Sequence, residues 1–236
     1  MKTVFHAAGS RGHADHGWLD SHHTFSFAGY YDPERMHFGV LRVLNDDVVA
    51  PGMGFGRHPH DNMEIISLPL EGDLEHKDSM GNQAVIREGD IQVMSAGTGI
   101  QHSEYNANVD RPVKFLQIWL FPRQRNVKPR YDQLSIKDIA QPEAFYQILS
   151  PEPSDQGVWI HQDAWFHLGR FERPAGLTHT LQREGNGLYV FVIEGEATAA
   201  GHRLSRRDGL GIEDTLTVDF SIGAHSTLLL MEVPMR

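Results

Sequence analysis

Short apolar runs separated by turn residues constrain the fold of this chain more than any other feature of its sequence. Runs rich in Val, Ile, Leu and Phe stand at Phe38–Leu44, Glu64–Leu70, Ile91–Met94, Val113–Phe121, Leu188–Ile193 and Thr227–Val233. The sequences between them are rich in Gly, Asn and Asp, which accept positive φ or cap their own backbone. Many short strands joined by turns predict an all-β sandwich or barrel.

A faint internal repeat predicts two β units rather than one. Leu70-Glu71-Gly72-Asp73 resembles Ile193-Glu194-Gly195-Glu196, and each tetrapeptide follows an apolar run. Between the two units, residues 122–153 are rich in proline and poor in strand-like runs. Such a stretch is typical of a connector.

Composition excludes several classes of protein. Of the 236 residues, 40% are hydrophobic and 22% are charged, as in ordinary globular proteins. The net charge of −10 argues against nucleic acid or an anionic membrane as the partner, because both attract basic surfaces. The absence of cysteine excludes disulfides and thiolate chemistry. Since neither a secretory leader nor an apolar stretch of membrane-spanning length is present, we expect a cytoplasmic protein.

Two pairs of potential metal ligands stand out among the 15 histidines and the carboxylates. On an extended strand, side chains two residues apart point to the same face. His58 and His60 therefore share a face, and so do His102 and Glu104. If the two pairs face each other inside a barrel, they form a three-nitrogen, one-oxygen set that suits Fe(II), Mn, Ni, Cu or Zn. The alternative is that His58 and His60 are unrelated, exposed residues of a glycine-rich loop.

Several stretches carry a resemblance to a known family. Residues 52–64 resemble the first sequence signature of the cupins, and residues 89–106 resemble the second. Together with residues 23–33 and 95–104, they resemble the pirins, in particular the bacterial pirin-like quercetin 2,3-dioxygenases. The resemblance is dense from about residue 12 to residue 121 and fainter beyond.

The resemblance implies a bicupin, in which two cupin (double-stranded β-helix, or jelly-roll) barrels follow each other in tandem. Residues 1–131 would form the metal-binding barrel, residues 132–146 a connector, and residues 147–236 a degenerate barrel without a metal site. Counting back from the repeated tetrapeptides agrees with this assignment. Leu181 and Arg183 stand in the second unit where the first has its histidine pair.

The pirin pattern places the metal ligands on His58, His60, His102 and Glu104. Glu64 is the alternative carboxylate ligand, because it has the strand parity of the histidine pair and many other cupins use a glutamate at that point. If Glu104 is the ligand, Glu64 is expected to orient a ligand histidine instead.

The implied function is a metal-dependent dioxygenase that cleaves flavonols such as quercetin with O2 and releases CO, with Glu104 as the general base. One divalent transition metal is expected, iron first, with Cu, Ni, Mn and Zn as alternatives. A second hypothesis is a metal-dependent regulatory protein that binds other proteins and has no dedicated substrate. A third is a cupin isomerase or lyase that uses Zn or Mn as a Lewis acid.

The remaining histidines are assigned to the surface or to packing. This holds for those around Trp18, namely His13, His16, His22 and His23. His76, in a polar run, is expected on a solvated hairpin. His167 and His179 lack same-face partners along the sequence and are weak ligand candidates.

Overall fold

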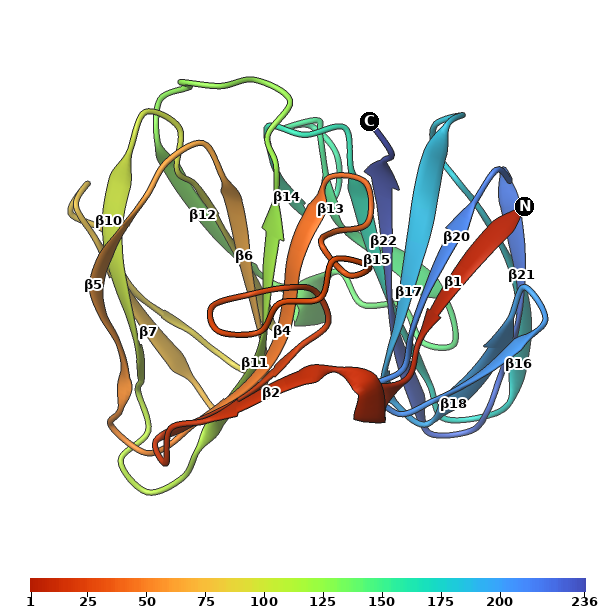
Figure 1. The fold of residues 1–236 in the computed structure, drawn as a ribbon, viewed down its shortest axis with the longest axis horizontal. Helices are drawn as coiled ribbons and strands as arrows, with labels where there is room; N and C mark the ends of the chain where they lie inside the picture. The colour runs from red at the N-terminus through yellow and green to blue at the C-terminus, as the bar shows by residue number, and fades with distance from the viewer.

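Two β-barrels lie side by side in the computed structural model, which describes residues 1–236 (Figure 1). Each barrel combines one seven-stranded and one four-stranded sheet. The helical segments are two short 3-10 turns, η1 (Ala8–Ser10) and η2 (Ile136–Asp138), so no helix has the length and apolar character needed to cross a membrane. The prediction of an all-β fold with two barrels in tandem is confirmed.

The first barrel contains the strands that carry the two candidate ligand pairs. Its seven-stranded sheet runs in the order β12 (Arg130–Ser135), β9 (Asp90–Ser95), β6 (Glu64–Glu71), β11 (Val113–Leu120), β4 (Leu41–Val49), β3 (Leu19–His23) and β2 (Gly12–Asp15). Its four-stranded sheet runs in the order β5 (Gly54–His60), β10 (Ile100–Asn106), β7 (Leu74–Asp78) and β8 (Gln83–Ile86).

The second barrel repeats this plan. Its seven-stranded sheet runs in the order β1 (Lys2–His6), β20 (Gly209–Glu213), β17 (Asn186–Glu194), β22 (Ser226–Pro234), β15 (Trp165–Phe171), β13 (Phe145–Ser150) and β14 (Val158–Trp159). Its four-stranded sheet runs in the order β16 (Ala175–Thr180), β21 (Thr217–Ile222), β18 (Glu196–Ala199) and β19 (His202–Ser205).

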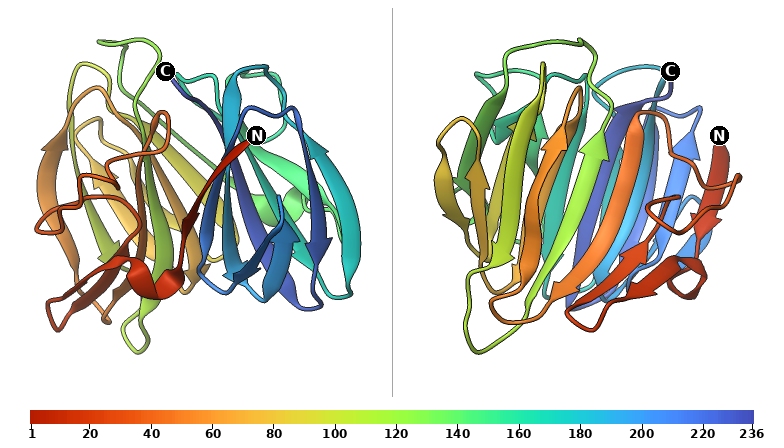
Figure 2. Two further views of the ribbon diagram at one scale, coloured as in Figure 1. Left: turned by 45° about the vertical axis from the view of Figure 1, so that its right-hand side comes forward. Right: turned by 60° about the vertical axis from the view of Figure 1, so that its left-hand side comes forward.

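The two barrels are not formed by two separate, continuous segments of the sequence. Strand β1 pairs with β20, so the N-terminal residues lie among the strands of the second barrel (Figures 1 and 2). The proline-rich stretch 122–153 contains strands β12 and β13, although its sequence predicts a connector. Strand β12 is half-buried along its whole length and pairs with β9 at the edge of the first barrel.

The internal repeat corresponds to the same turn in both barrels. Gly72 lies between β6 and β7 with φ of 76°, and Gly195 lies between β17 and β18 with φ of 78°. A Cβ atom on Gly195 would overlap Oγ of Ser226. Positive φ and close approach both favour glycine, which explains why it recurs at these two turns.

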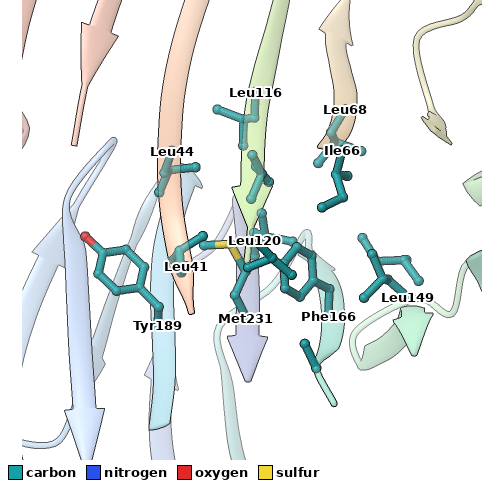
Figure 3. Packing of buried hydrophobic residues seen from close by; sticks show 14 of the residues in the cluster. Leu41, Leu44, Ile66, Leu68, Leu116, Leu120, Leu149, Phe166, Tyr189 and Met231 are labelled. Atoms are coloured by element: carbon teal, nitrogen blue, oxygen red, sulfur yellow. The ribbon is translucent and has the colours of Figure 1, made fainter. Parts of the chain in front are cut away.

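The largest apolar core lies between the barrels, where the two seven-stranded sheets pack against each other. This cluster contains 27 buried residues from both halves of the chain. Figure 3 labels ten of them: Leu41, Leu44, Ile66, Leu68, Leu116, Leu120, Leu149, Phe166, Tyr189 and Met231. The barrels are therefore joined by a continuous hydrophobic interface rather than by the linking chain alone.

Phe166→Ala is expected to destabilise the whole protein by about 3–5 kcal/mol, because Phe166 is fully buried in this interface and its loss leaves a cavity. Urea denaturation followed by tryptophan fluorescence measures the change. Phe5→Ala is the matched control, since Phe5 is 41% exposed, and should cost about 1 kcal/mol or less. Equal effects of the two substitutions would contradict this account of the interface.

Candidate metal centre

The two predicted ligand pairs lie on neighbouring strands of one sheet. Strands β5 and β10 pair in antiparallel fashion, and His102 stands directly opposite His58. The register then shifts, so that Glu104 pairs with Phe55. Such a bulge re-aims side chains and is common beside active sites. The pairs are thus adjacent within a sheet, whereas the sequence suggested that they face each other across the barrel.

The three histidines converge. Their ring centroids are 4.4 Å apart for His58 and His102, 4.8 Å for His58 and His60, and 4.9 Å for His60 and His102. One nitrogen from each ring can be chosen so that all three lie within 4.8 Å of one another. A single ion with metal–nitrogen bonds of about 2.0–2.1 Å needs only small side-chain rotations to contact all three.

The hydrogen-bonding state of the rings fits a metal ion. Nδ1 of His58 lies 2.7 Å from the carbonyl oxygen of Gly56, to which it can donate a hydrogen bond, so Nε2 is left as a free acceptor. Nε2 of His60 and both ring nitrogens of His102 are buried without any partner. Buried polar atoms are rarely left unpaired, and a bound cation would satisfy one nitrogen of each ring.

The electrostatics keep the rings of His60 and His102 neutral, which is the form that binds metal. Burial, reinforced by the neighbouring imidazoles, lowers the pKa of His60 to about 4. Burial and the proximity of His58 and His76 lower the pKa of His102 to about 3. At neutral pH these two rings therefore offer lone pairs without first losing a proton.

Glu104 lies beside this set but groups with different neighbours. Its carboxylate, with His76 and His102, forms a second cluster of potential ligand atoms within 4.8 Å, and all three residues are buried. The hydroxyl of Ser67 donates a hydrogen bond of 2.9 Å to Oε1 of Glu104. His102 belongs to both clusters and stands at the centre of the arrangement.

A row of buried polar side chains crosses the barrel next to Glu104. Gln117 on β11 pairs with Asn45 on β4 and with Ser67 on β6, and Ser67 pairs with Gln92 on β9. Oδ1 of Asn45 and both amide atoms of Gln92 lack partners. The row divides the interior, because Phe115 on β11 packs in one apolar cluster and Trp119 packs against another.

Comparison with known proteins identifies the family. Residues 4–120 match the pirin family, and residues 147–233 match the family described as the quercetinase C-terminal cupin domain. A quercetin 2,3-dioxygenase from Escherichia coli K12 is 43% identical over 227 residues, which cover 96% of each chain. This chain belongs to the pirin family. The resemblance inferred from the sequence motifs is confirmed.

Other pirins extend the similarity to structure. A pirin-like protein from Caulobacter vibrioides is 36% identical over 222 residues, covering 94% of this chain and 95% of that one. The crystal structure of the bacterial pirin YhhW from Escherichia coli in complex with nickel(II) superimposes with a TM-score of 0.93 at 40% identity, covering 99% of both chains. That pirin therefore binds a transition metal.

His76 is the residue of this pirin's centre that sequence reasoning placed wrongly. The polar run around it predicted a solvated hairpin, but its side chain is fully buried. Its Nε2 lies 3.3 Å from Oδ2 of Asp78, and its ring stands 4.7 Å from that of Tyr131. His76 occupies a position of β7 that points into the barrel. The charged residues on either side of it made the segment look solvent-exposed in the sequence.

Glu64 lies away from the histidines, because the parity argument fails at the end of β5. The chain turns at Asn62, which has positive φ, and continues in the other sheet as β6. Glu64 then shares a face with Ile66 and Leu68 in the core between the barrels. Its Oε2 accepts hydrogen bonds from Ser95 Oγ at 2.7 Å and from the His161 backbone at 3.3 Å.

Glu64→Gln is expected to change how stability depends on pH. Burial raises the pKa of Glu64 to about 7, against an ordinary value of 4.5. Between these values the native state binds more protons than the unfolded state, so stability falls as pH rises, and the loss is complete above about 7. Between pH 4.5 and pH 8, the free energy of unfolding of Glu64→Gln should therefore rise by on the order of 3 kcal/mol relative to that of the wild type.

Denaturation curves measured across this pH range would test the effect. Glu71→Gln is a matched control, because Glu71 is exposed at the other end of the same strand. A stability difference between Glu64→Gln and wild type that stays constant with pH would contradict the assignment.

The second barrel brings together two histidines that the sequence did not pair. The rings of His167 and His179 are 4.8 Å apart, both residues are buried, and one nitrogen of each has no partner. Neither histidine has a same-face partner on its own strand, and they meet because β15 and β16 belong to different sheets of one barrel. Leu181 and Arg183 follow β16, and Arg183 forms an ion pair with Asp163.

His60 has neighbours on the outer surface of the barrel as well as inside it. His60 forms part of the wall of a surface hollow of about 510 Å³, whose lining includes the exposed residues Arg57, Pro59 and Gln101 of the outer sheet face. The ring of His60 also stands 4.9 Å from that of Trp119, which in turn packs edge-on against Phe27.

Proposed function

We propose that this pirin is a metal-dependent dioxygenase that cleaves flavonols such as quercetin with O2 and releases CO. The observation that carries the proposal is the convergence of three imidazoles whose free nitrogens lie within 4.8 Å of one another, beside a buried carboxylate. The identity of 43% to a quercetin 2,3-dioxygenase over nearly the whole chain supports the same chemistry.

We assign one divalent transition metal ion to His58, His60 and His102, with Glu104 as the fourth ligand. When bound, such an ion supplies Lewis acidity and, for iron or copper, redox chemistry towards O2. Iron is the first ion to test, followed by nickel, because nickel(II) occupies the related pirin of Escherichia coli. Copper, manganese and zinc also suit these ligands.

Glu104 is the proposed general base and so a catalytic residue. Its Oε1 accepts the hydrogen bond from Ser67, which fixes the orientation of the carboxylate. In this orientation Oε2 is the atom left to hold the metal, and once released it takes the proton of the flavonol 3-hydroxyl. The resulting enolate is electron-rich enough to react with O2. The depth of Glu104, which is 1% exposed, keeps bulk water away from that proton.

The aromatic wall is proposed to position the substrate. Trp119 and Phe27 present apolar ring faces and edges next to His60, and such surfaces suit the flat, conjugated rings of a flavonol. In this arrangement the reacting end of the substrate points towards the histidines, and the remaining ring packs against Trp119.

The test is O2 uptake with quercetin. The protein is stripped with a chelator, reloaded separately with Fe, Cu, Ni, Mn or Zn, and assayed with an oxygen electrode and a CO detector. Metal-dependent O2 consumption with matching CO release supports the proposal and identifies the competent ions. Stoichiometric metal binding without turnover for any ion would overturn it and favour a regulatory protein without a dedicated substrate.

A further inference from the structure

The hairpin of β2 and β3 carries a second set of metal-ligand side chains, on the outer surface of the first barrel. His13 stands directly opposite His22 in the antiparallel pairing, and Asp20 shares the face of His22 because it is two residues away. The side chains are 50%, 36% and 49% exposed for His13, His22 and Asp20. Each offers a ligand atom, and the three atoms lie within 4.8 Å of one another.

The separations of these atoms match those within a coordination sphere. Oδ1 of Asp20 lies 2.9 Å from Nε2 of His13 and 3.4 Å from Nδ1 of His22. Two ligand atoms each about 2.1 Å from one ion are about 3.0 Å apart at octahedral angles and about 3.4 Å apart at tetrahedral angles. The two separations from Asp20 thus already match one coordination sphere, and the two imidazole nitrogens lie within 4.8 Å of each other.

We propose that His13, Asp20 and His22 form a second transition-metal site, with a two-nitrogen, one-oxygen ligand set completed by water. Imidazole and carboxylate ligands with open positions suit Cu(II), Ni(II) and Zn(II). The site takes the free aqueous ion directly, because its ligands stand at the surface.

The surroundings of the three side chains can accommodate a cation. Both imidazoles approach the same carboxylate oxygen, and their rings lie 4.5 Å apart at an interplanar angle of 24°. The nearby positive charge of Arg11 is paired with Asp46 at 3.2 Å, so it repels an incoming cation less than a free guanidinium would.

This site is separate from the proposed catalytic centre and does not depend on the proposed function. The intervening residues of β3 point inward, where Ser21 contacts Asp47 and the ring of His23 inside the barrel. An ion on the outer face would cross-link β2 to β3, at the edge of the seven-stranded sheet. Its binding should therefore stiffen the hairpin without occupying the histidine set of β5 and β10.

Titration of metal-free protein with Zn(II), followed by calorimetry, tests the proposal. Wild type should bind two ions per chain. His13→Gln and His22→Gln should each weaken one of the two events by about tenfold or more and leave the other unchanged. His16→Gln is the matched control, an exposed histidine of the same hairpin outside the cluster, and should retain both events.

A second variant separates this site from the catalytic centre. His60→Ala should lose the other event and keep the hairpin ion, and in that variant bound Cu(II) should show two nitrogen donors by electron paramagnetic resonance. Circular dichroism verifies that each variant is folded. Two undiminished events in both hairpin variants, or a single event in wild type that His60→Ala abolishes, would overturn the proposal.

Discussion

Replacing His102 by alanine is expected to abolish tight metal binding at the centre and quercetin-dependent O2 uptake together. His102 is 2% exposed, both of its ring nitrogens lack partners, and it belongs to both clusters of ligand atoms. Loss of a residue that merely supports a ligand typically costs about 10–100-fold in metal affinity, so loss of this ligand should cost at least about 100-fold. The readouts are metal content after dialysis and oxygen consumption.

Thermal unfolding with and without added metal gives an independent measure of the same substitution. Wild type should show a higher Tm with metal, because the ion binds the native state, and His102→Ala should lose most of that increase. His37→Ala is the control, since His37 is exposed and lies outside both clusters. Full metal content and turnover in His102→Ala would contradict the assigned centre.

Glu104→Gln is expected to separate metal binding from turnover. Glutamine keeps the shape of the side chain and can still accept the hydrogen bond from Ser67, but it cannot take a proton. The three histidines should retain the ion, while kcat falls by about 100- to 10,000-fold, the usual contribution of a general base.

Ser67→Ala provides a graded comparison, because it leaves the carboxylate in place and removes only the hydrogen bond to its Oε1. A smaller loss of kcat in Ser67→Ala, with a changed pH profile, would identify Ser67 as a positioning residue. If Glu104→Gln kept kcat within about threefold of wild type, Glu104 would not be the base.

Most of the fold could be predicted from the sequence, because apolar strand patterns and turn residues depend only on neighbouring positions in the chain. The apolar runs at Glu64–Leu70 and Val113–Phe121 coincide with β6 and β11, and the repeated Glu-Gly pairs mark the same turn in both barrels. The strand β12 was missed, since a half-buried edge strand needs few apolar residues.

The candidate site could be predicted from the sequence only in part, and the residues that were misplaced have physical reasons for it. Parity correctly grouped His58 with His60, because both lie on one uninterrupted strand. It failed for Glu64, because the turn at Asn62 separates β5 from β6 and the alternation of faces does not continue through a turn. His76 was hidden because its ring is buried by tertiary packing, while its sequence neighbours remain exposed or half-exposed.

The row of buried polar side chains is visible in the sequence as single polar residues within apolar runs. Ser67, Gln92 and Gln117 each interrupt an apolar run at a single position: Ile66-Ser67-Leu68, Ile91-Gln92-Val93 and Leu116-Gln117-Ile118. A lone polar residue inside a buried strand is costly unless it has a partner or a role. What the sequence could not give is the register that places the three side chains side by side.

The pairing of β1 with β20 bears on how the polypeptide reaches its native state. Residues 2–6 have their partners at residues 209–213, so β1 cannot dock until that much later segment of the chain has been synthesised. Cutting the chain between the barrels would leave the C-terminal fragment with β20 as an open sheet edge, which invites aggregation. Closing the second barrel is therefore a late folding step, because it joins segments that are far apart in the sequence.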